Sequence, residues 1–134
     1  MSESPIPAIR AILMCDTVIQ EAGTGKKTLV GVFDRFIFPN VPAQIGGFTF
    51  FARITDLNGS YSFRIDVVDL REDKKLARIE TNEFTHDDPL GSMDLVLPIP
   101  PIRFINFGKH EFQLYANNIY LGRCVIDVTK LEGA

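Results

Sequence analysis

The chain lacks several features that whole classes of protein require. It holds only two histidines in 134 residues, so a zinc site built from several histidines is impossible. Lys and Arg number 14 against 17 Asp and Glu, which leaves no basic field to attract a nucleic acid. No apolar run approaches the roughly 20 residues of a membrane span. We therefore expect no nucleic-acid partner and no membrane span.

A secretory signal and a cysteine framework are also missing. Residues 1–7 contain no basic segment, and the apolar run 11–15 is too short for the centre of a signal peptide. We expect a cytoplasmic protein, in which cysteines normally remain thiols. Cys15 and Cys124 are then interpreted as two small buried hydrophobic residues; a bridge between them is the alternative.

Helical periodicity is absent, whereas apolar and polar residues alternate between recurring turn signals. This pattern predicts an all-β protein. The length suits one domain that buries roughly two-thirds of its unfolded surface. We expect a single antiparallel β-sandwich of about eight strands, immunoglobulin-like or C2-like, over residues 1–134, with residues 1–8 as a flexible N-terminus.

The clearest pattern flanks Asn58-Gly59. Apolar residues alternate on both sides of this pair, and Asn-Gly is the favoured centre of a two-residue type I′ turn. A turn here sets Ile54 opposite Phe63, so the turn and the apolar pattern give the same register. The sequence predicts a hairpin whose second face is polar except where Phe51 and Val68 interrupt it.

A second hairpin is predicted around Asn117-Asn118, between strands 111–115 and 120–128. A strict two-residue turn sets Phe112 opposite Arg123, whereas one extra residue sets it opposite Cys124. We expect a bulge or a three-residue loop.

The segment GTGKKT, residues 23–28, resembles a phosphate-binding loop only in part. Gln20 stands where the first glycine of that motif belongs, and a β-rich run follows in place of a helix. We interpret the segment as a turn between strands 9–20 and 28–38, with Lys26 and Lys27 in solvent. Both strands are apolar on two faces, which is typical of strands covered on both sides, here by a loop, a crossing segment or another subunit.

This turn brings Asp16 towards Asp34 and Arg35. Charged groups in the middle of apolar strands need partners if they are buried. The three residues are interpreted as an ion-pair or hydrogen-bond network that fixes the register. A small polar binding spot is the alternative.

The sequence shows no pattern of catalytic or metal-binding residues. The nucleophile motif Gly-x-Ser-x-Gly is absent, and neither cysteine nor histidine lies in an arrangement that marks an activated group. Several aspartates suggest calcium, but no loop has the regular spacing of oxygen ligands: Asp56, Asp66, Asp69, Asp87, Asp88 and Asp94. We expect no cofactor and no enzyme.

A proline-rich stretch at residues 97–104 offers two interpretations. Pro98 and Pro101 match the Pro-x-x-Pro pattern of polyproline ligands. Proline also removes ladder hydrogen bonds, which favours an edge strand or a crossover between sheets.

Two longer segments, TGKKTLVGVFDRFIFPNVP (24–42) and PPIRFINFGKHEFQLYANNIYLG (100–122), together with Asp16, resemble a family of small bacterial proteins that is a domain of unknown function. The resemblance spans nearly the whole chain. It implies a compact β-sandwich in a bacterial cytoplasm, and it implies no catalytic residue. A likeness of fold does not supply a function.

These observations favour a non-enzymatic module that binds another protein or assembles with itself. The candidate interface residues are Phe51, on an otherwise polar face, and the prolines Pro98, Pro100 and Pro101. A C2-like module for calcium or a lipid surface is the alternative, and a hydrolytic enzyme is a third hypothesis.

Overall fold

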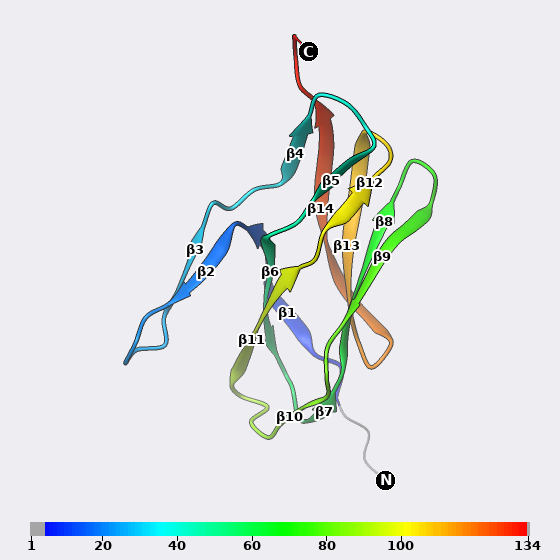
Figure 1. Cartoon of the computed structure of the whole chain (residues 1–134). Coiled ribbons are helices and arrows are strands. Elements are labelled where there is room, and N and C mark those ends of the chain that lie inside the picture. The colour runs from blue at the N-terminus through cyan, green and yellow to red at the C-terminus, as the bar shows by residue number, and fades with distance from the viewer. Residues whose placement is uncertain (1–4, 134) are drawn as a thin grey trace.

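A computed structural model describes residues 5–133, and every regular element in them is a β-strand (Figure 1). The all-β prediction is confirmed, but the described residues form 14 strands in five sheets in place of about eight strands in one sandwich. Residues 1–4 of the predicted flexible N-terminus lie outside the described residues, and the first strand begins at Ala8. The strands are β1 (Ala8–Cys15), β2 (Thr17–Gln20), β3 (Lys27–Val30), β4 (Arg35–Phe38), β5 (Ala43–Ile45), β6 (Phe48–Thr55), β7 (Gly59–Tyr61), β8 (Phe63–Asp69), β9 (Lys74–Glu80), β10 (Phe84–His86), β11 (Ser92–Ile99), β12 (Ile102–Phe104), β13 (Gly108–Ala116) and β14 (Ile119–Lys130).

Two larger sheets enclose the core. One has the order β1-β6-β11 and the other the order β4-β14-β13-β8-β9. Their pairs are antiparallel except β4 with β14, which are parallel. Inward side chains of both sheets belong to one buried cluster; the rings of Phe48 and Phe112, for example, meet at 6.1 Å. The remaining sheets are the two-stranded pairs β2-β3, β5-β12 and β7-β10, which Figure 1 labels.

The predicted hairpin at Asn58-Gly59 is wrong. Strands β6 and β8 lie in different sheets, and β7 between them pairs with β10. Gly59 has a positive φ of 131°, but Asn58 does not, so the type I′ turn does not form. The assignment of the apolar face is nevertheless correct, because Ile54 and Phe63 are both buried in the core.

The predicted C-terminal hairpin is confirmed. Asn117 and Asn118 form its turn with positive φ values of 48° and 66°. Phe112 lies opposite Cys124, and the register shifts between Leu114 and Tyr115. The hairpin therefore combines a two-residue turn with a bulge, one of the two irregularities expected.

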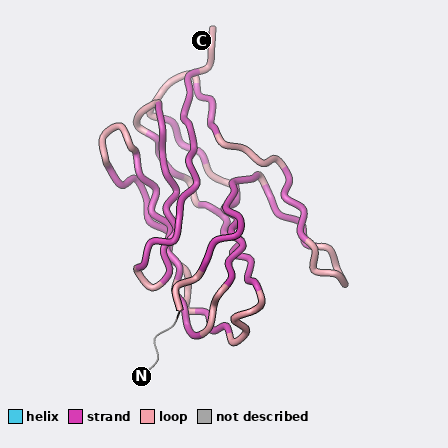
Figure 2. Tube along the Cα trace, turned by 180° about the vertical axis from the view of Figure 1, so that it is seen from behind, coloured by secondary structure: helices cyan, strands magenta, loops and turns pink. Residues whose placement is uncertain are grey.

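The predicted turn at residues 23–28 also closes a hairpin, but a smaller one than expected. Each long strand is divided: β1 and β4 join the two larger sheets, while β2 and β3 pair only with each other among the described strands. We call this hairpin, residues 17–30, the arm. In both views it extends away from the two larger sheets (Figures 1 and 2).

The proline-rich stretch forms an edge strand and a link between sheets. β11 is an outer strand of its sheet and contains Pro98, opposite Thr49. Pro100 and Pro101 then connect β11 to β12, which pairs with β5.

Candidate functional site

A cavity of about 480 Å³ opens at the base of the arm. Asp16, at the bend between β1 and β2, lines it together with Arg35, the first residue of β4. Two exposed aliphatic side chains, Val32 and Ile37, complete its rim. We call it the arm-base cavity.

The floor of the arm-base cavity is aromatic. Phe33, Phe36 and Phe48 line it, and their ring centroids lie 5.0 to 5.8 Å apart in tilted and edge-on arrangements. Such packing holds the rings in place, because aromatic pairs at these distances attract each other beyond their burial alone. The cavity therefore has a rigid apolar floor and a rim that carries one carboxylate and one guanidinium.

Asp16 and Arg35 are exposed, and neither forms an ion pair with any residue of the described range 5–133. The Asp16 carboxylate instead lies against Gly31, whose φ is 70° and where a Cβ would overlap it. Asp34 faces another cavity, of about 420 Å³, that Arg35 also lines. The structure thus brings Asp16 and Arg35 to one cavity and does not join all three residues in a network.

Phe51 is only 5% exposed, so the expectation of an exposed interface residue is wrong. The arm extends away from the β1-β6-β11 sheet but touches it at two points: β2 contacts β6, and Lys27 of β3 reaches Asp94 of β11. Half-buried Leu29 lies two residues from Lys27 and therefore faces the same way. The outer face of this sheet is covered only in part, because Leu13 and Val96, which lie opposite Phe51 in the register, are 39% and 36% exposed. Pro98, Pro100 and Pro101 are exposed.

The arm is fastened to the sheet by an ion-pair cluster. The Asp94 carboxylate lies 2.7 Å from Lys27 Nζ and accepts two hydrogen bonds from Arg53, at 2.7 and 2.9 Å. The hydrogen bonds from Arg53 lower the pKa of Asp94 to about 2, with a further contribution from Lys27. The sequence predicts Lys27 in solvent and offers Asp94 as a calcium candidate, whereas the structure pairs the two side chains. The register of β6 against β11, which sets Arg53 opposite Asp94, could not be obtained without the sheet order.

We expect Asp94→Asn to loosen the arm. The side chain of Asp94 is 8% exposed, and its lowered pKa corresponds to about 2 kcal/mol of stability at neutral pH. Because the folded pKa lies below the unfolded one, this contribution is present above about pH 4 and is lost as the pH falls towards 2. Hydrogen exchange at pH 7 should be faster in residues 17–30, whereas Asp87→Asn, at an exposed site, should change nothing. Unaltered exchange in the arm would contradict this role.

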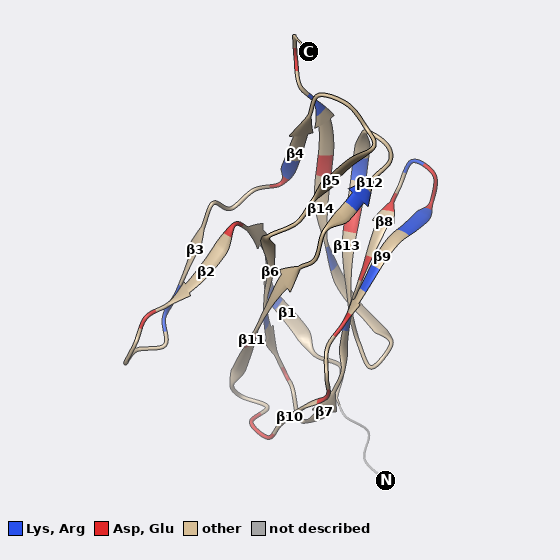
Figure 3. Cartoon of the chain, in the orientation of Figure 1, with Lys and Arg blue, Asp and Glu red and all other residues tan. Residues whose placement is uncertain are grey.

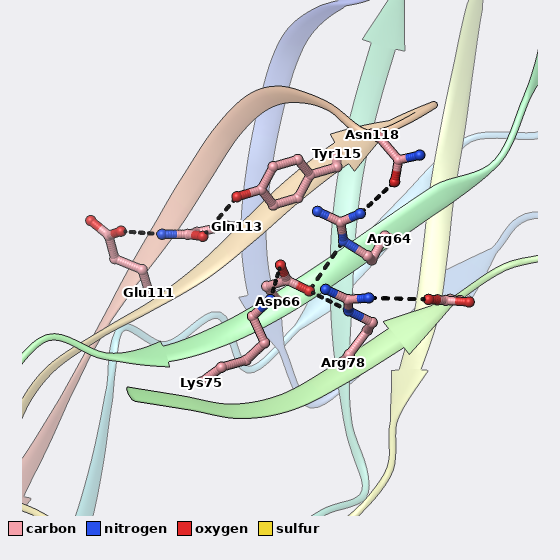
Figure 4. A network of polar contacts seen from close by, with 9 residues as sticks. Arg64, Asp66, Lys75, Arg78, Glu111, Gln113, Tyr115 and Asn118 are labelled. Carbon is pink, nitrogen blue, oxygen red and sulfur yellow. Dashed lines mark hydrogen bonds and ion pairs between the residues drawn. The ribbon is translucent and has the colours of Figure 1, made fainter. Parts of the chain in front are cut away.

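A second polar cluster covers the outer face of the larger sheet (Figure 4). Asp66 of β8, 2% exposed, lies 3.0 to 3.2 Å from nitrogen atoms of Arg64, Lys75 and Arg78. The Arg64 guanidinium stacks over the Tyr115 ring at 4.1 Å. These contacts hold the charged side chains of β8 and β9 against one another, so the cluster stabilises the sheet face, and both oxygens of Asp66 are engaged by cations.

None of the aspartates forms a metal site with its neighbours: within residues 5–133, no group of three or more His, Cys, Asp or Glu side chains is placed to hold an ion. Asp69, which is fully buried, accepts hydrogen bonds from Asn106 Nδ2 at 2.7 Å and from the amide of Arg71 at 2.9 Å. Burial raises its pKa, but these hydrogen bonds outweigh that effect and hold the pKa below its usual value. Across the same described residues, no helix is long and apolar enough to cross a membrane.

Both cysteines are free thiols. Cys124 lines an apolar cavity of about 330 Å³ on the other side of Val32 and Phe33, together with Leu13. Burial, and then the nearby Asp34 carboxylate, raise the pKa of Cys124 to about 11. The thiol is therefore protonated at neutral pH and is a poor nucleophile.

The comparison with protein families agrees with this description. The chain belongs to a family described as "Family of unknown function (DUF6941)", whose model matches residues 10–129. The resemblance to a domain of unknown function is thereby confirmed, while a bacterial origin stays a prediction. No curated protein matches the chain.

Proposed function

We propose that this protein is a non-enzymatic module that binds another protein chain through the base of its arm. The observation that carries the proposal is a group of exposed aliphatic side chains around two adjoining cavities: Leu13 is 39% exposed, Val32 54% and Ile37 52%. We call these three residues, with Asp16 and Arg35, the arm-base surface. Exposed apolar groups rimmed by charges and set beside preformed hollows are typical of protein-binding sites.

The position of Val32 supports this use. Val32 and Phe33 separate the arm-base cavity from the apolar cavity that holds Leu13 and Cys124, and they line both. A partner that covers Val32 would therefore bury apolar surface on its two sides. Burial of such surface is the main favourable term in protein association.

The lining of the arm-base cavity favours binding over catalysis. It contains no Ser, His, Cys or Lys, the residues that most often serve as nucleophile or general base. Asp16 and Arg35 are the charged groups of the lining, and neither is paired with a group that would activate it within residues 5–133. One charge of each sign over an apolar floor suits a protein surface better than a polyanion.

The order of strands supports an immunoglobulin-like sandwich as the scaffold. Six of the eight strands in the two larger sheets match the arrangement of such domains. β1, β6 and β11 correspond to the first, second and fifth strands in one sheet, and β8, β13 and β14 to the third, sixth and seventh in the other. In this reading, the arm is inserted within the first strand, at the point where the chain passes from one sheet to the other. The arm would then be the feature that distinguishes this module.

Val32→Asp should abolish partner binding without unfolding the protein. Val32 is more than half exposed, so we expect its replacement to change stability by less than about 0.5 kcal/mol, while a buried carboxylate in the interface would prevent association. To measure binding, Ile37 is replaced by a photo-crosslinking phenylalanine analogue and the protein is irradiated in cells that express it naturally.

The expected result is one covalent adduct to a defined protein, identified by mass spectrometry, that disappears when Val32→Asp is added. The matched control places the same crosslinker at Ile119, which is 46% exposed on the distant β13-β14 hairpin. Equal adducts from both positions, or none from position 37, would overturn the proposal.

A further inference from the structure

We infer that the partner on the arm-base surface is a second copy of this chain, related by a two-fold axis, in which Asp16 of each copy pairs with Arg35 of the other. This inference rests on the proposed function and names its partner. It starts from two opposite charges that share the rim of one cavity yet form no ion pair within the described residues. Each therefore keeps its ion-pairing capacity for another molecule.

A two-fold interface has a specific requirement that this surface meets. In such an interface, if residue i of one copy contacts residue j of the other, then j also contacts i. A surface with one carboxylate and one guanidinium is complementary to itself under this operation, because each copy offers both halves of the pair. Opposed charges across an interface also fix its register and suppress other partners.

The apolar part of the surface is self-complementary in the same way. Val32 and Ile37 line the same cavity as the two charged residues, and both are more than half exposed. Under a two-fold axis, the aliphatic side chains of one copy face the hollow of the other. Asp34, which lines the adjoining cavity, adds a second carboxylate, so the surface carries one negative charge of the net −3 of each chain, and Asp16 and Arg35 supply its pair of opposite charges.

The strands of the arm provide independent support for a like partner. Their outward side chains are uncharged, namely Thr17, Ile19, Thr28 and Val30, and Lys27, the charged residue of these strands, is held by Asp94. In Figure 3 the charges of the arm gather near its tip. Exposed strand edges normally carry charges or prolines that prevent pairing with other chains. Two identical strand edges pair antiparallel across a two-fold axis. The edge of the arm carries no free charge and no proline in its strands, so it also suits a second copy.

The test exchanges the charges. Asp16→Arg and Arg35→Asp should each weaken self-association at least tenfold, measured by sedimentation velocity over a range of concentrations, because each places like charges opposite each other. The double variant should associate again, with a mass close to twice the 15.0 kDa of one chain. An equimolar mixture of the two single variants should form the dimer as well, since one copy then carries two cations at the interface and the other two anions. A structural role within one chain cannot produce that rescue.

Other outcomes separate this inference from the proposed function. If Val32→Asp dissolves the wild-type dimer but the charge variants do not, the reciprocal pair is wrong and the proposed function stands. If the wild type is monomeric at every concentration while the crosslinker at position 37 captures a different protein, the second copy is wrong and the proposed function again stands. Neutral variants, Asp16→Asn and Arg35→Gln, serve if a charge reversal impairs folding, and they should weaken the dimer by a smaller factor.

Discussion

Replacement of Phe48 by alanine is expected to lower the free energy of unfolding by about 3–5 kcal/mol. Phe48 is the first residue of β6, is 4% exposed, and lies 5.2 Å from the ring of Phe36 and 6.1 Å from that of Phe112. It therefore packs against two strands of the opposite sheet as well as forming part of the cavity floor. Removal of the ring leaves a cavity that the neighbouring side chains cannot fill. The loss of stability therefore exceeds the transfer free energy of the buried ring alone.

Urea denaturation followed by far-ultraviolet circular dichroism measures this effect. The matched control is Phe84→Ala, in which the same side chain is removed from a position that is 41% exposed; its cost should stay below about 1.5 kcal/mol. Phe48→Leu should cost less than Phe48→Ala, because it keeps most of the apolar volume. If Phe48→Ala lost less than 1 kcal/mol, the aromatic cluster would not be the junction between the sheets.

The strands, their buried faces and the hairpin β13-β14 could be predicted from sequence, but the pairing of β6 and β8 could not. Alternation identified the inward residues of β6 and β8, including Ile54 and Phe63, because a period of two reports which face is apolar. The same alternation fits a hairpin within one sheet and a connection between two packed sheets, since both place these residues in one core. The Asn-Gly pair favours a hairpin locally. The tertiary packing that places β6 and β8 in different sheets overrides this preference and cannot be detected in a short stretch of sequence.

For the candidate site as well, some features could be predicted from the sequence and others could not. Asp16 and Arg35 were selected as charges in apolar strands, and they do meet at one cavity. Phe51 is predicted at an interface because alternation places it on a polar face and gives no sign that the ring is buried within the chain. Lys27 is predicted in solvent because its partner Asp94 lies 67 positions later in the chain and no local pattern links the two. Contacts between single side chains that are far apart in the sequence could not be predicted from motifs and periodicity.

Asp66→Asn is expected to cost about 3 kcal/mol of stability at pH 7. The substitution keeps the shape of the side chain but removes the anion that three cations share, at 3.2 Å from Arg64 Nε, 3.0 Å from Lys75 Nζ and 3.2 Å from Arg78 Nε. Lys75 and Arg78 are 46% exposed and can turn towards water, but the side chain of Arg64 is 17% exposed, stacks on the Tyr115 ring and donates a hydrogen bond to Asn118. The uncompensated charge of Arg64 therefore dominates the expected loss.

The dependence on pH distinguishes lost charge from disturbed packing in this variant. Burial raises the pKa of Asp66, but the hydrogen bond from Lys75 and the charges of Arg64 and Arg78 outweigh it, so the pKa lies below its usual value. A lowered folded pKa adds stability that is fully present above the unfolded pKa of about 4 and is lost as the pH falls through the folded value. The difference in stability between wild type and Asp66→Asn should thus stay constant from about pH 5 to 8 and narrow below about pH 4.

The control is Glu80→Gln, at an exposed carboxylate 3.9 Å from Arg78, which should lower the stability by less than about 0.5 kcal/mol. A difference for Asp66→Asn that persisted unchanged at pH 2 would show that packing, and not the shared anion, carries the effect.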